Sequence, residues 1–281
     1  MIIELFGPPG SGKTTFATAL ATRLRESGRS VDLTLSYRPA ERPRRSPALR
    51  SGASATWPSP VAQRLCRPLL EMLAISRHPL LLSHNIGATT RLVRLLPPRR
   101  VAVAIRLSQY ILRLLHTWSQ ASTVGHIVIF DQAFVQVVCS LALFARTADD
   151  QVMARALAYS PRPDLLIKLD APPEILTTRL KNRIEGQGPL ERLLEIDLTM
   201  DMASIRIINR LHALLTGYGQ SVMSATSLDE PSLRESVERV DKRLVAMFSA
   251  NQRALALPRS SFDMSGIPLP HENARCESRD H

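Results

Sequence analysis

Residues 5–15, LFGPPGSGKTT, have the spacing of a loop that binds phosphate. Gly7, Gly12, Lys13 and Thr14 fit the pattern G-x-x-x-x-G-K-[ST]. Glycines let backbone N–H groups converge on phosphate oxygens, the lysine reaches the β- and γ-phosphates, and the threonine hydroxyl coordinates Mg²⁺. The positive end of a following helix adds to the attraction. These residues therefore predict a nucleoside triphosphate site.

The composition and the flanking segments support this interpretation. Only four of the 36 basic residues are lysines, and one of them, Lys13, stands where a compact ammonium is needed. The apolar run 1–6 favours a buried strand, and residues 13–28 favour a helix with apolar side chains four apart. A surface loop that matches the pattern by chance is the alternative, and the order strand, loop, helix argues against it.

Two further sets of side chains could act on a bound phosphate. Asp131 ends the apolar run IVIFD, so its carboxylate is expected at the sheet edge where ligands of open α/β sheets bind. Capping of the next helix is its alternative role. Arg179 and Arg183 are four residues apart, so a helix would present both on one face, next to the turn EGQGP that would suit a movable lid. A solvated, salt-bridged helix face is the alternative.

Strand and helix patterns alternate along the chain, which predicts an α/β fold with a parallel five-stranded sheet and helices on both faces. We expect the strands at 1–6, 30–37, 126–131, 163–170 and 220–225. We expect helices at 13–28, 61–75 and 101–118, then from about 172, and at 190–215 and 230–248. Residues 78–87 and the Pro97–Pro98 break are expected to separate the second helix from the third.

The expected organisation is one domain, residues 1–250, followed by a disordered tail, 251–281. Residues 40–60 are rich in Pro, Ser and Arg, which predicts a flexible loop. Residues 38–130 hold fourteen arginines but only two acidic residues, whereas the net charge of the whole chain is +11. Such a basic middle region predicts an anionic acceptor or partner, and a solvated arginine-rich surface is the alternative.

Several other functional classes are disfavoured. The three cysteines, Cys66, Cys139 and Cys276, lack metal-binding spacing, which favours a reducing, cytoplasmic location. The histidines form no zinc motif, and the N-terminus has no signal-peptide pattern. Residues 127–145 are long and apolar enough for a membrane span, but their polar residues and β-branched start favour a buried strand followed by a buried helix.

The sequence resembles the thymidylate kinase-like branch of the P-loop nucleoside and nucleotide kinases. The resemblance lies in FGPPGSGKTT, in IVIFDQAF and in PDLLIKLDAPPEILTTRLKNR, and SVMSATS is similar to that family's closing strand, whose following loop packs against adenine. It implies the three-layer P-loop NTPase fold. The chain departs from the family at Gln132, where members usually have arginine, and between Arg38 and Phe130.

The resemblance also implies roles for individual residues. The expected nucleotide-binding residues are those of the loop, namely Gly7, Gly10, Ser11, Gly12, Lys13, Thr14 and Thr15. Thr14 and Asp131 would lie near Mg²⁺, Arg179 and Arg183 would be lid cations with Arg192 a weaker candidate, and Arg38 would contact the acceptor.

Three functions are compatible with these features. The first is a kinase that transfers the γ-phosphoryl group of ATP to a small acceptor, a nucleotide or another anionic metabolite. The second is a nucleotide-dependent regulatory ATPase or switch whose basic middle region binds an acidic partner. The third is a nucleic-acid-binding ATPase, which is less favoured because the basic region has few aromatic residues for stacking on bases. A second copy of the chain is a further candidate partner.

Overall fold

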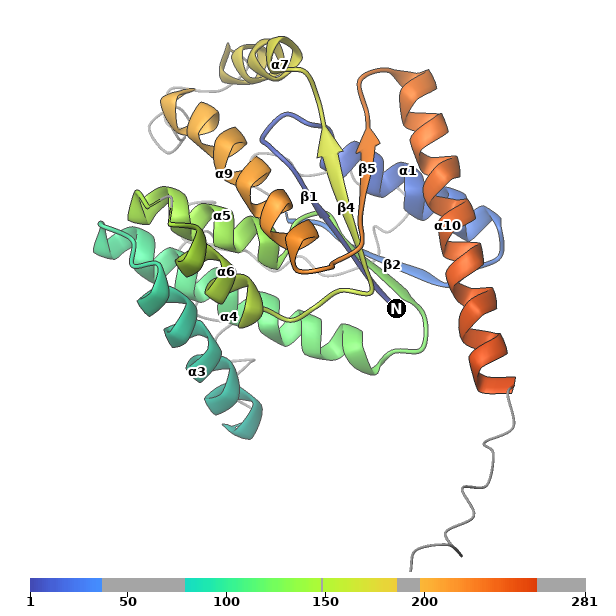
Figure 1. Cartoon of the computed structure of the whole chain (residues 1–281), viewed down its shortest axis with the longest axis horizontal. Helices are drawn as coiled ribbons and strands as arrows, with labels where there is room; N and C mark the ends of the chain where they lie inside the picture. The colour runs from blue at the N-terminus through green and yellow to red at the C-terminus, as the bar shows by residue number, and fades with distance from the viewer. Residues whose placement is uncertain (37–78, 148, 186–197, 257–281) are drawn as a thin grey trace, which may run out of the picture. The chain divides into compact units, whose positions relative to one another are not determined.

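The computed structural model describes residues 1–36, 79–147, 149–185 and 198–256 (Figure 1). Its centre is a five-stranded sheet in which every pair of neighbouring strands is parallel. The strands are β1 (Ile2–Phe6), β2 (Val31–Thr34), β3 (Ile127–Phe130), β4 (Leu165–Asp170) and β5 (Val222–Thr226). The predicted parallel sheet of five strands is therefore confirmed.

The strand order is β2-β3-β1-β4-β5, so the first strand of the chain lies in the middle of the sheet. Ile3 of β1 lies opposite Ile129 of β3 on one side and opposite Leu165 of β4 on the other. The chain passes from β1 to the edge strand β2, returns to β3 beside β1, and then crosses to β4 and β5. The connections after β1 and β3 thus run in opposite directions, which places a topological switch point at the carboxyl ends of these two strands. The predicted phosphate-binding loop, residues 7–12 between β1 and α1, leaves the sheet at this point.

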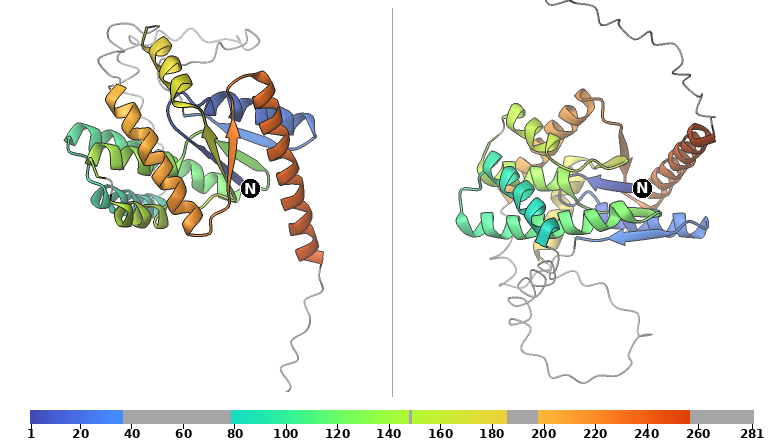
Figure 2. Two further views of the ribbon diagram at one scale, coloured as in Figure 1. Left: turned by 45° about the horizontal axis from the view of Figure 1, so that its top comes forward. Right: turned by 90° about the horizontal axis from the view of Figure 1, so that it is seen from below.

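Helices cover both faces of the sheet (Figures 1 and 2). The helices are α1 (Lys13–Glu26), α3 (Pro79–Leu95), α4 (Val101–Thr123), α5 (Phe134–Ala145), α6 (Asp150–Ala158), α7 (Pro173–Glu185), α9 (Leu198–Gly217) and α10 (Glu230–Ala256). Helix α1 packs on β1, β2 and β3 from one face, while α5 and α9 pack together on the opposite face. The predicted three-layer α/β arrangement, a parallel sheet between two layers of helices, is confirmed.

All five side chains of β1 are buried, because this strand has helices on both faces. Ile2 and Phe6 join the core beneath α4, α5 and α9. Ile3 and Leu5 point to the opposite face, where Phe16 of α1 is also fully buried. The continuous apolar run at the start of the sequence therefore reflects burial on two faces.

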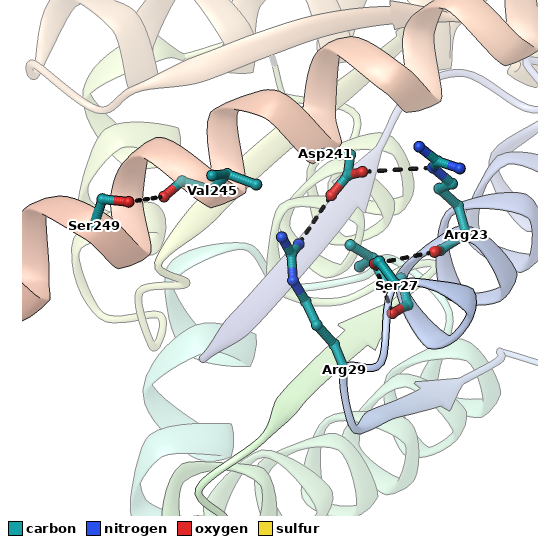
Figure 3. A network of polar contacts seen from close by, with 7 residues as sticks. Arg23, Ser27, Arg29, Asp241, Val245 and Ser249 are labelled. Atoms are coloured by element: carbon teal, nitrogen blue, oxygen red, sulfur yellow. Dashed lines mark hydrogen bonds and ion pairs between the residues drawn. The ribbon is translucent and has the colours of Figure 1, made fainter.

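The chain divides into two compact units, residues 1–241 and 242–281. In the first unit, the carboxylate of Asp241 on α10 forms ion pairs with two arginines (Figure 3). Arg29 Nη1 lies 2.9 Å from one carboxylate oxygen, and Arg23 Nε lies 3.5 Å from the other. Arg29 and Asp241 are mostly shielded from solvent, so their ion pair helps to attach this part of α10 to the end of α1.

In the second unit, Ser249 Oγ donates to the Val245 carbonyl at 3.0 Å.

The structure differs from the sequence-based prediction in the middle of the chain. Residues 79–95 form helix α3, although residues 78–87 were expected to separate helices. The buried face of α3 includes Asn85 and Thr89 beside Leu92 and Leu96, so polar residues interrupt its apolar pattern. Helix α6 was not predicted; Asp149 caps it through its side chain.

Other elements agree with the prediction within a few residues. Strand β2 is shorter than the expected 30–37, α4 continues to Thr123, and α10 continues to Ala256. The expected loop at 40–60, the helix at 61–75, the first residues of the expected helix 190–215 and most of the expected tail lie outside the described residues. The division of the chain at residue 250 stays a prediction.

The apolar segment 127–145 forms β3 followed by the buried helix α5, as the sequence predicted. In the part of the chain that the structure describes, no helix combines the length and the apolar character that crossing a bilayer would require. The apolar character of this segment is explained by its position, because β3 is entirely buried and eight residues of α5 are buried.

Glu4 is an unusual member of β1 because its side chain is fully buried. One carboxyl oxygen accepts a 2.7 Å hydrogen bond from the Val135 N–H, and the other has no partner among the described residues. Burial raises the pKa of Glu4 from its ordinary 4.5 to about 8, and the hydrogen bond from Val135 only partly opposes this effect. Glu4 is therefore protonated at neutral pH.

We expect this carboxyl group to make the stability of the protein depend on pH. The unfolded group loses its proton near pH 4.5 and the folded group near pH 8, so the free energy of unfolding should fall as the pH rises through this window. Glu4→Gln keeps an acceptor for Val135 and cannot ionise, so the variant should gain a few kcal/mol relative to the wild type between pH 6 and pH 9.

Urea unfolding of both proteins at pH 6 and pH 9 measures this difference. Glu230→Gln is the matched control, because that glutamate is exposed and its side chain is 80% accessible. A constant difference between Glu4→Gln and the wild type at the two pH values would contradict the prediction.

Candidate functional site

A cleft of about 720 Å³ opens at the carboxyl end of the sheet. It lies within residues 1–241 and is bounded by the phosphate-binding loop, the start of α1, the ends of β2 and β3, helix α7 and the loop between β5 and α10. Its lining residues are Pro9, Gly10, Gly12, Lys13, Thr14, Thr15, Ser36, Gln132, Arg179, Ser227, Leu228, Asp229, Glu230 and Leu233. Five of the seven predicted loop residues therefore line the cleft, namely Gly10, Gly12, Lys13, Thr14 and Thr15.

The conformation of the phosphate-binding loop requires glycine at two positions. Gly12 has φ +88°, and a Cβ there would lie 2.9 Å from Ser227 Oγ. A Cβ on Gly7 would lie 2.5 Å from the Leu169 carbonyl oxygen of β4. Gly12 is also the N-cap of α1 and has no side chain that could cap the helix. The backbone N–H groups of the first turn of α1 are therefore not capped by a side chain, and this turn lines the cleft. This is the arrangement that binds anions.

The side chain of Lys13 binds back to the loop that precedes it. Its Nζ donates to the Gly7 carbonyl at 2.9 Å and to the Pro8 carbonyl at 2.8 Å. The residue is buried, yet it lines the cleft. The ammonium is therefore held against the loop at the base of the cleft.

Thr14 and Asp131 meet although 117 residues separate them in the sequence. Thr14 Oγ1 donates to Asp131 Oδ2 at 2.9 Å, and the Ser36 N–H donates to Asp131 Oδ1 at 2.7 Å. Burial raises the pKa of Asp131, whereas the hydrogen bonds from Ser36 and Thr14 favour its carboxylate form. The parallel order β3-β1 brings this pair together, because both strands end at the same edge.

The Thr14–Asp131 pair suits Mg²⁺. A hydroxyl and a carboxylate are hard oxygen ligands, and Mg²⁺ commonly takes one or two protein oxygens together with phosphates and waters. Among the described residues, no group of three or more His, Cys, Asp or Glu side chains could hold a metal ion by itself. Such a site would therefore depend on a bound polyphosphate.

Arg179 of α7 joins three segments of the cleft. Its guanidinium donates to the Gly10 carbonyl at 3.1 Å, to the Ser227 carbonyl at 2.9 Å and to the Leu228 carbonyl at 2.8 Å. One planar group thus links the phosphate-binding loop to the loop after β5. Arg179 lies on the β4–β5 side of β1, whereas Asp131 follows β3 on the other side of β1.

The loop between β5 and α10 is held by its own hydrogen bonds. Asp229 Oδ1 accepts from the Ser232 N–H at 2.9 Å, and Ser232 Oγ accepts from the N–H groups of Leu228 and Asp229 at 3.1 Å. The hydrogen bonds that the side chain and the N–H of Ser232 give to the Asp229 carboxylate lower the pKa of that group. The start of α10 is therefore a capped helix whose preceding residues line the cleft.

The structure thus brings together Lys13, Thr14, Asp131 and Arg179 from the predicted site. Gly7 and Ser11 shape the loop from within, since Ser11 is fully buried. The side chain of Arg183, and Arg38 and Arg192 as a whole, lie outside the described residues. The assigned roles of all these residues stay predictions.

Sequence reasoning did not identify Ser36 or Tyr110. Ser36 contacts Asp131 through its backbone N–H, a contact that carries no signal in the residue type. Tyr110 lies on α4 and meets Ser36 only through tertiary packing. A weak signal existed for the loop after β5, because Asp229 precedes Ser232 by three residues, the spacing of a helix cap.

Curated relatives of the chain are thymidylate kinases. That of Xanthomonas campestris pv. campestris strain B100 is 26% identical over 215 residues, which cover 74% of this chain and 75% of the relative. That of Xylella fastidiosa strain 9a5c is 31% identical over 107 residues, which cover 36% of this chain and 48% of the relative. No family model matches the sequence.

Solved structures with a similar course of the chain include the deoxyadenosine kinase of M. mycoides with dCMP and dCDP bound. It is 13% identical, covers 88% of this chain and 100% of its own, and has a TM-score of 0.46. The same enzyme with bound dATP is 12% identical, with a TM-score of 0.44.

We expect Arg179→Ala to loosen the cleft without unfolding the protein. Three carbonyl groups would lose their shared donor, so amide hydrogen exchange should accelerate severalfold in residues 10–12 and 227–229. Arg179→Lys should show a similar effect, because an ammonium cannot reproduce the planar fork.

Hydrogen exchange followed by mass spectrometry measures this change. The matched control is Arg106→Ala, which removes an exposed arginine from α4. Exchange in Arg179→Ala that equals the control in both segments would rule out the linking role.

Proposed function

We propose that this chain, a thymidylate kinase-like P-loop nucleotide kinase, uses ATP and Mg²⁺ to phosphorylate a nucleotide or another small anionic metabolite. The observation that carries the proposal is the contact of Thr14 Oγ1 with Asp131 Oδ2 beside Lys13, at the open N-terminus of α1. The similarity to thymidylate kinases over three quarters of the chain makes nucleoside monophosphates the first acceptors to test.

The donor phosphates would bind along the start of α1. Backbone N–H groups of residues 10–15 would face the phosphate oxygens, and Lys13 Nζ would exchange its two carbonyl contacts for the β- and γ-phosphates. Thr14 and Asp131 would hold Mg²⁺, which would offset the negative charge of the phosphates. The adenine would lie towards Ser227 and Leu228, which line the cleft beyond Arg179.

Transfer requires an acceptor oxygen in line with the γ-phosphorus and the oxygen that leaves with ADP. The new bond forms from the acceptor oxygen to phosphorus as the bond from phosphorus to the β,γ-bridging oxygen breaks. The protein contributes by positioning and by neutralising charge, through Lys13 at the base of the loop and Arg179 at its flank. The acceptor would enter on the side of Ser36 and Gln132, which line the cleft next to Asp131.

The direct test is to incubate the protein with labelled ATP, Mg²⁺ and pools of nucleotides, nucleosides and sugars. A labelled small product in the nucleotide pool supports the proposal, and thymidylate is the first single compound to assay. Absence of product in every pool, with ATP still bound, would contradict phosphoryl transfer to a small acceptor.

A second candidate function, a nucleotide-dependent switch, is favoured by one observation. Residues 79–130 contain no acidic residue, and six of their arginines are exposed, namely Arg91, Arg94, Arg99, Arg100, Arg106 and Arg113. Such a surface attracts an acidic protein or a nucleic acid. Release of phosphate that only such a partner stimulates, without a labelled small product, would favour this function.

Lys13→Ala should weaken ATP binding by about 10- to 100-fold, because charge-assisted hydrogen bonds to the phosphates are lost. Calorimetric titration with ATP measures the affinity. Lys242→Ala is the matched control, since Lys242 is an exposed lysine of the second unit. Equal ATP affinity in Lys13→Ala and the wild type would remove the donor assignment.

Asp131→Asn should slow turnover at least about tenfold and leave the binding of ATP in EDTA nearly unchanged. The amide keeps much of the shape but carries no charge for the metal. Steady-state rates together with ATP titration in EDTA separate the two effects, with the exposed Asp150→Asn as the control. A normal rate in Asp131→Asn would mean that this carboxylate has no part in transfer.

A further inference from the structure

The carboxylate of Asp131 is shared between two parts of the chain. One oxygen accepts from Thr14 at the start of α1, and the other accepts from the backbone of Ser36 just after β2. Asp131 is 1% exposed, so water contributes little to its solvation. The direction of the carboxylate therefore depends on where the exit of β2 is held.

Ser36 is held by its hydroxyl group. Ser36 Oγ donates to the Gln132 carbonyl at 3.3 Å and lies 3.3 Å from the Tyr110 hydroxyl. The first contact ties the exit of β2 to the residue that follows Asp131. The second ties it to α4, a helix that is anchored in the core by Ile111 and Leu114.

Tyr110 is suited to serve as this anchor. Burial raises the pKa of its phenol, so the group stays protonated and remains able to donate. The Arg113 guanidinium carbon lies 5.6 Å from the centre of the Tyr110 ring, which further restricts the ring. The phenol thus has a fixed position relative to the sheet, from which it can locate Ser36.

We propose that Ser36 and Tyr110 are positioning residues of the nucleotide site, which fix the exit of β2 so that the Ser36 N–H holds one oxygen of Asp131 and the other oxygen faces Thr14. This inference rests on the proposed function, because it concerns the binding of Mg²⁺ with ATP. Residues that orient a metal ligand commonly change metal affinity by 10- to 100-fold when the ligand is contacted directly, and a hydroxyl one step further away should have a smaller effect.

The test measures the dissociation constant of ATP in EDTA and in Mg²⁺. The constant in EDTA divided by the constant in Mg²⁺ reports how much the metal contributes to ATP binding. We expect Tyr110→Phe and Ser36→Ala each to reduce this ratio about threefold to tenfold, with the dissociation constant in EDTA unchanged. Ser36→Thr keeps a hydroxyl and should restore most of the ratio. The double variant should be no worse than Ser36→Ala, because Ser36→Ala already removes the contact with Tyr110.

Tyr218→Phe is the matched control, because that tyrosine is 70% exposed. An equal loss of affinity with Mg²⁺ and with EDTA would show a merely structural role and overturn the inference. An unchanged ratio in Tyr110→Phe and Ser36→Ala would overturn it as well. A wild-type protein whose ATP affinity is indifferent to Mg²⁺ would instead remove the metal assignment in the proposed function, and the inference with it.

Discussion

The hydrogen bond between Thr14 and Asp131 is the interaction on which the site depends. It joins the first turn of α1 to the end of β3 at 2.9 Å, across 117 residues of sequence. The contact exists because β1 and β3 are parallel neighbours, so that the loop after one strand and the carboxylate after the other reach the same edge. A shift of one residue in this pairing would turn alternate side chains to the wrong face and separate the two groups.

The opposite side of the cleft depends on a cation. Arg179 donates to carbonyl groups of the phosphate-binding loop and of the loop after β5, so α7, β1 and β5 are linked without a direct strand contact between β1 and β5. The Thr14–Asp131 pair thus lies on the β3 side of β1, and the Arg179 guanidinium lies on the β4–β5 side. This distribution of charge suits a ligand that carries both phosphates and their metal ion.

Much of the fold could be predicted from the sequence, because its strongest signals are local. The strands β1, β3 and β4 are apolar runs with clear ends, and burial of all their residues except Asp170 explains why they were identified. Helix α3 was missed because Asn85 and Thr89 are part of its buried face, and α6 because it has only nine residues. In both cases tertiary packing outweighed the local pattern.

The predicted phosphate-binding loop could be found from local sequence alone, since glycine spacing and the lysine that follows are properties of consecutive residues. The end of a buried strand likewise marked Asp131. The contacts of Ser36 with Asp131 and with Tyr110 follow only from the folded chain, because a backbone N–H has no residue type and Tyr110 lies on a helix 74 positions from Ser36. Contacts between distant segments depend on strand order and helix packing, which no single stretch of sequence specifies.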